Sequence, residues 1–64
     1  MKVREVIRRL EADGWRLVAT VGSHRQFKHP DKVGRVTVSG RLADDMPKGT
    51  LVSVRRQAGI KELR

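Results

Sequence analysis

The chain has 64 residues, of which 38% are hydrophobic and 34% charged, and its formal net charge at pH 7 is +8. A chain of this length forms one small domain over residues 1–64, and the absence of cysteine excludes disulfides and thiolate chemistry. The net charge is +4 in residues 1–29 (seven basic, three acidic) and +4 in residues 30–64 (eight basic, four acidic), so it belongs to the whole domain. The electrostatic field of this positive charge attracts nucleic acid, and it would also attract an acidic protein or an anionic membrane surface.

Residues 2–13 are predicted to form an amphipathic helix that ends at Gly14, a residue type common at helix C-termini. The apolar residues of this segment recur at i, i+3, i+4 and i+7: Val3, Val6, Ile7 and Leu10. The charged residues between them interrupt any signal-peptide core or membrane-spanning stretch. We therefore expect a cytoplasmic protein with no membrane partner.

Three short strands are predicted next, over residues 15–21, 24–29 and 35–39. The first two are separated by the turn residues Gly22-Ser23, and the last two by a turn over residues 30–34. Two consecutive short turns imply a three-stranded antiparallel meander.

The apolar residues of the strands predict which faces point inward. Alternation in the first strand is expected to place four residues on one face: Trp15, Leu17, Ala19 and Val21. Trp15 and Phe27 are expected in the core, because the domain has no other aromatic residues to fill its interior.

A polar loop over residues 40–48 leads to a second helix, which is predicted to begin at residues 48–50 and to end at Gly59. Its apolar residues repeat at helical spacing: Leu51, Val54 and Ala58. The element order is therefore α-β-β-β-α. The expected fold is α+β, with two helices packed on one face of a three-stranded antiparallel sheet.

Strand alternation also predicts where His24 lies. If Phe27 points toward the helices, then His24, Gln26 and Lys28 share the opposite, uncovered face, and Thr37 joins them if its two valine neighbours point inward. Cleavage of RNA through its 2′-hydroxyl needs a base, a proton source and positive charge near the phosphate, and these side chains fit that need. The simpler alternative is a solvated histidine on a solubilising surface.

No metal or other cofactor is expected. His29 lies about 16 Å from His24 along an extended strand and points to the other face, so it should border the turn rather than share a site. Two distant histidines without cysteine do not make a zinc site. Asp44 and Asp45 would bind magnesium only weakly, and adjacent carboxylates of this kind more often lie at the start of a helix.

The segment Pro47-Lys48-Gly49-Thr50 admits two interpretations. Backbone N–H groups at a helix start beside a lysine form a phosphate cradle, and ordinary capping by Thr50 or a neighbour explains the same residues. The spacing does not match a nucleotide-binding P-loop.

The ordered combination of motifs along the chain resembles a HicA-type toxin. These motifs are Asp13-Gly14-Trp15, Gly22-Ser23-His24, Gln26-Phe27-Lys28-His29-Pro30, Gly34-Arg35-Val36-Thr37-Val38, Lys48-Gly49-Thr50-Leu51 and Gln57-Ala58-Gly59. The resemblance covers nearly the entire chain. It implies a fold like that of double-stranded-RNA-binding domains, cleavage of mRNA, and neutralisation by a HicB-type antitoxin.

The resemblance also implies that His24, in the Gly22-Ser23-His24 turn, is the active histidine. Many relatives follow the third strand with a proline and a second histidine. This chain has Ser39-Gly40-Arg41 instead, so the contribution of that histidine is absent or passes to Arg41.

These observations predict a metal-independent endoribonuclease toxin in which His24 acts as catalytic acid or base. The residues expected to bind RNA are Ser23, Arg25, Gln26, Lys28, Thr37, Arg41 and Lys48. Two alternatives remain open: a nucleic-acid-binding module without catalysis, and an interaction protein whose charge serves an acidic protein ligand.

Overall fold

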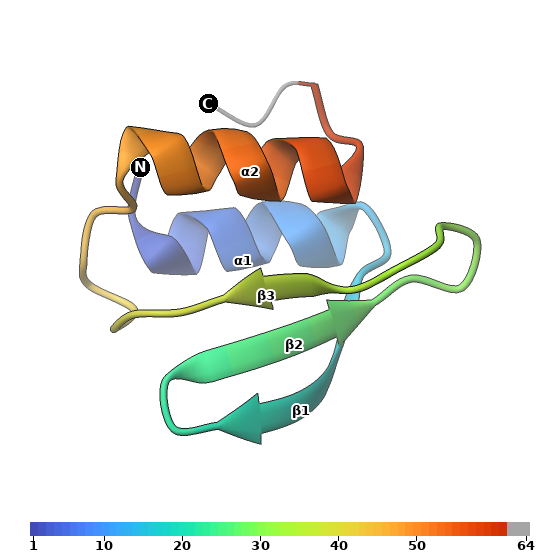
Figure 1. The fold of residues 1–64 in the computed structure, drawn as a ribbon, viewed down its shortest axis with the longest axis horizontal. Coiled ribbons are helices and arrows are strands. Elements are labelled where there is room, and N and C mark those ends of the chain that lie inside the picture. Colours follow the sequence, from blue (N-terminus) through green and yellow to red (C-terminus); the bar gives the residue numbers. More distant parts are fainter. Residues whose placement is uncertain (62–64) are drawn as a thin grey trace.

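The computed structural model describes residues 1–61, which form two helices and three strands. The elements are α1 (Val3–Ala12), β1 (Arg16–Val21), β2 (His24–Lys28), β3 (Val36–Val38) and α2 (Lys48–Ala58). Both helices lie on the same side of the sheet, next to β3, and β1 lies farthest from them (Figure 1). The predicted α-β-β-β-α order and the α+β fold are confirmed.

The helices cover only part of the sheet. The strand order is β1-β2-β3, and both neighbouring pairs are antiparallel. The buried apolar residues are Val3, Val6, Leu10, Trp15, Phe27, Val36, Val38, Met46, Val54, Ala58 and Ile60. Trp15 and Phe27 are 0% and 1% exposed, as their predicted place in the core requires. By contrast, no residue of β1 is buried, so this edge strand is accessible.

A β-bulge changes the faces of β1. Leu17 lies opposite Phe27, and Ala19 lies opposite Gln26, so the pairing skips Val18 and the register shifts there. Because cross-strand partners share a face, Leu17 points to the helix side and Ala19 points to the open side. The prediction that Trp15, Leu17, Ala19 and Val21 share one face is therefore wrong.

The loop between β3 and α2 caps α1 rather than α2. The Val3 N–H donates to the carbonyl of Asp44 over 2.9 Å. Asp45 pairs with Lys2 in an isolated bridge, with 3.7 Å between Lys2 Nζ and Asp45 Oδ1. These two aspartates thus lie at the start of a helix, but the helix is α1 rather than the one that follows them in the sequence, and the loop serves N–H groups that the first turn of α1 leaves without intrahelical partners.

The two ends of α2 differ in how they are capped. At the start, Pro47 is the N-cap and no side chain caps the helix, so capping by Thr50 is not observed. At the end, Gly59 has φ of 67°, and the Ile60 N–H donates to the Arg55 carbonyl over 3.2 Å. The predicted glycine cap is confirmed, because a left-handed residue at this position favours glycine.

Candidate functional site

His24 is the first residue of β2 and lies on the face of the sheet that the helices leave open. It follows the Gly22-Ser23 turn directly and pairs with Val21 of β1. Its side chain is exposed, and the ring has no hydrogen-bond partner within residues 1–61. The imidazole is therefore accessible to a ligand from the open side.

Gln26, Lys28 and Thr37 lie on the same face as His24. Phe27, between Gln26 and Lys28, is buried on the helix side, so its neighbours point to the open side. Thr37 is exposed directly opposite Gln26, because the valines on either side of it are buried. The placement of these four side chains agrees with the sequence prediction.

Arg35 also belongs to the open face, although sequence reasoning did not select it. Its Nη1 donates a hydrogen bond to Oε1 of Gln26. Arg35 lies two residues before Thr37, so strand alternation alone places both on one face. The predicted third strand, residues 35–39, already contained Arg35, so the alternation that placed Thr37 would have identified it.

Arg25 does not share the face of His24. It pairs with Val38, whose side chain is fully buried, and its Nη1 donates to the carbonyl of Gly40 over 2.9 Å. This contact anchors the loop after β3 at the residue before Arg41. The structure therefore gives Arg25 a positioning role and does not bring it to the open face.

The remaining residues predicted to bind RNA lie at the edges of this region. Ser23 is exposed in the turn beside His24. Arg41 is exposed, with its Nε 3.6 Å from Asp44 Oδ2. Lys48 is the first residue of α2, in the helical layer rather than on the open face (Figure 1).

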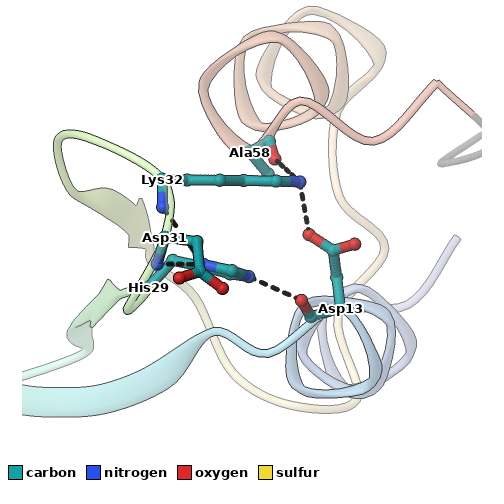
Figure 2. A network of polar contacts seen from close by, with 5 residues as sticks. All are labelled: Asp13, His29, Asp31, Lys32 and Ala58. Carbon is teal, nitrogen blue, oxygen red and sulfur yellow. Dashed lines mark hydrogen bonds and ion pairs between the residues drawn. The ribbon is translucent and has the colours of Figure 1, made fainter.

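His29 lies outside this region and joins α1 to the loop after β2. The N–H groups of Asp31 and Lys32 donate to its Nδ1 over 3.0 and 3.2 Å. Since Nδ1 accepts both, the ring proton is on Nε2, which donates to the carbonyl of Asp13 over 2.7 Å (Figure 2). The side chain therefore contacts the loop and the end of α1, and β2 ends at Lys28 rather than at the predicted residue 29.

Lys32 connects the same loop to both helices (Figure 2). Its Nζ donates to Oδ2 of Asp13 over 2.6 Å and to the carbonyl of Ala58 over 3.0 Å. The hydrogen bond from the Lys32 ammonium holds the pKa of the Asp13 carboxyl below its usual value, although desolvation opposes that shift. We call Asp13, His29, Lys32 and Ala58 the polar clasp.

The described residues offer neither a clustered metal site nor a membrane span. Within residues 1–61, no three histidine, aspartate or glutamate side chains gather as a metal site would require. No helix in the same part of the chain is long and apolar enough to cross a membrane.

Fold and open face together define a small, basic α-β-β-β-α protein with one exposed histidine on an uncovered sheet. The family model described as HicA toxin of bacterial toxin-antitoxin matches residues 3–60. The chain belongs to this family, and the resemblance predicted from its motifs is confirmed. No curated protein matches the chain. Family membership makes the protein a toxin of a toxin–antitoxin system.

Proposed function

We propose that this toxin is a metal-independent endoribonuclease that cleaves mRNA in the cytoplasm, with His24 as its catalytic acid or base. The observation that carries the proposal is the accessible imidazole of His24 on a sheet face without acidic residues. None of the three strands contains aspartate or glutamate, so a polyanion meets no repulsive carboxylate there.

The proposed reaction uses the RNA's own 2′-hydroxyl as nucleophile. A base removes the proton of this hydroxyl, the 2′-oxygen attacks phosphorus, the bond to the 5′-oxygen breaks, and that oxygen takes up a proton. The products are a 2′,3′-cyclic phosphate and a free 5′-hydroxyl. His24 performs one of the two proton transfers, because imidazole titrates nearest to neutrality.

Arg41 is the cation we assign to the phosphate next to His24. Continuing the β2–β3 register by one residue places Ser39 opposite His24, and Arg41 follows two residues later. Arg25 fixes this loop through the Gly40 carbonyl. A guanidinium beside the reacting phosphate stabilises the charge that develops in the transition state.

The partner we propose is a HicB-type antitoxin that covers His24. Val21, the direct neighbour of His24 across the strands, is 68% exposed on the open face. The same edge strand also exposes Val18 (50%) and, on the helix side, Leu17 (52%), so a partner that covers His24 could extend around this edge. Exposed apolar side chains beside a basic surface suit burial by a protein of complementary charge.

The proposal is tested with purified protein and a single-stranded RNA, in the presence and absence of EDTA. We expect equal cleavage in both conditions and products that carry 2′,3′-cyclic phosphates. The same RNA with 2′-O-methyl groups should stay intact, because its nucleophile is blocked. Loss of cleavage with EDTA, or cleavage of the methylated RNA, would contradict the proposed chemistry.

The second candidate is an RNA-binding module without catalysis, and the exposed cations of the open face favour it as well. It predicts salt-sensitive RNA binding without products, and no growth arrest when the protein is expressed without a partner. Cleavage by the purified protein excludes it.

A further inference from the structure

Three cations gather at the end of the open face that lies away from His24. Arg16 of β1 pairs directly with Lys28 of β2, so their side chains leave the sheet on the same side. Arg35 reaches this face through its hydrogen bond to Gln26. All three are exposed, and we call them the basic row.

The basic row is not neutralised by the protein. Like charges directly opposite each other in a sheet destabilise it. Among the residues that the structure describes, the ion pairs engage only Lys2, Lys32 and Arg41. The sheet thus holds Arg16 and Lys28 next to each other with no carboxylate between them, an arrangement that an anion would relieve.

The basic row and His24 are too far apart to contact one phosphate group. His24 and Lys28 are four residues apart on β2, which is about 13 Å along an extended strand. Gln26 and Thr37 lie between them on the same face and provide polar groups along the path. A single nucleic-acid strand that follows β2 would reach both ends with different phosphates.

We infer that the basic row binds a phosphodiester of the RNA substrate a few nucleotides away from the bond at which His24 acts. This inference rests on the proposed function and extends it, because it assigns the path of the substrate along β2. Lys28 then anchors a neighbouring phosphate rather than the reacting one. Gln26 positions Arg35 by accepting its hydrogen bond, which limits the directions in which the guanidinium can point.

The test compares two variants that lose the same number of positive charges. One replaces the basic row (Arg16→Gln, Lys28→Gln, Arg35→Gln), and the other replaces exposed arginines of α1 (Arg4→Gln, Arg8→Gln, Arg9→Gln). Both are assayed on a single-stranded RNA of about twelve nucleotides. The α1 variant controls for the general field of the protein, since it changes net charge without touching the open face.

We expect the basic-row variant to raise KM by about tenfold or more while kcat stays close to that of the unchanged protein. The slope of log affinity against log salt should fall in magnitude by about 0.7, the contribution of one phosphate contact on a single strand. The α1 variant should keep KM within about twofold, because its substitutions remove no contact to the bound RNA strand.

Binding is measured separately by fluorescence anisotropy with 2′-O-methyl RNA, which separates this inference from the proposed chemistry. Weaker binding by the basic-row variant alone supports the inference even if no RNA is cleaved. Equal losses in the two variants would mean that only net charge matters, and the inference would be overturned. Normal RNA binding by the basic-row variant would also overturn the inference. This holds even if the variant no longer bound the antitoxin, because the basic row would then serve the antitoxin rather than RNA.

Discussion

The two histidines of the chain lie five positions apart and have opposite surroundings. His24 is exposed, and its ring has no hydrogen-bond partner among residues 1–61. His29 is half-buried, uses both ring nitrogens, and packs edge-on against Trp15 with 5.3 Å between the ring centroids. One histidine is available for chemistry, and the other holds the fold together.

Gly14 shows how closely the chain packs around His29. Its φ is 104°, a left-handed value that favours glycine, and a Cβ there would lie 2.8 Å from Nε2 of His29. Each residue of the Asp13-Gly14-Trp15 motif therefore serves His29. Asp13 offers a carbonyl to its Nε2, Gly14 leaves room for the ring, and the indole of Trp15 packs against it.

Replacing His29 by alanine should lower the free energy of unfolding by about 2 kcal/mol, because three hydrogen bonds to backbone groups are lost together. Urea unfolding followed by Trp15 fluorescence measures this change. His24→Ala is the matched control and should change stability by less than about 0.5 kcal/mol. Similar stability of the two variants would contradict the structural role of His29.

The polar clasp joins both helices to the loop after β2. Lys32 lies 19 residues from Asp13 and 26 residues from Ala58 in the sequence. Its ammonium donates a hydrogen bond to the carboxylate of Asp13 and another to a carbonyl in the last turn of α2, where carbonyls have no intrahelical donor. The clasp thus sets how α1, α2 and the loop sit against one another.

The ion pair in the clasp predicts acid sensitivity. The pKa of Asp13 is lowered in the folded protein, so its contribution to stability is present above the unfolded pKa and is lost as pH falls through the folded value. Lys32→Met should lower stability by about 1 kcal/mol at pH 7 and reduce the loss of stability below about pH 5.

Urea unfolding at neutral and acidic pH tests this prediction, with Lys48→Met as control. Lys48 is exposed at the start of α2 and takes part in no ion pair within residues 1–61. The control should therefore keep the acid sensitivity of the unchanged protein. If Lys32→Met keeps it as well, another group is responsible.

How far the sequence predicts the structure depends on the range of the interactions. Local patterns predict α1, the strand order, the Gly59 cap and the open-face position of His24, because each depends on residues close in the chain. The bulge at Val18 is not predictable from the apolar run around it, since the pairing with β2 decides the register. The clasp and the capping of α1 by the loop after β3 join residues far apart in sequence, and no local pattern indicates them.

The two sides of the sheet differ in the side chains that they present. The helix side contains the core, whereas the open side combines His24, polar side chains and the basic row. The net charge of +8 attracts polyanions to the protein as a whole and does not by itself select a binding site. We propose that the uncovered sheet selects the site, because it places an imidazole and arginine and lysine side chains on one face.

We propose above that His24 performs one of the proton transfers in RNA cleavage. The most direct test of this proposal is the cleavage rate of purified His24→Ala protein on the same RNA as the unchanged protein, with urea unfolding as proof of folding. We predict a loss of about a hundredfold or more, the range expected when a general acid or base is removed. A folded His24→Ala protein that cleaves RNA at the original rate would contradict the account.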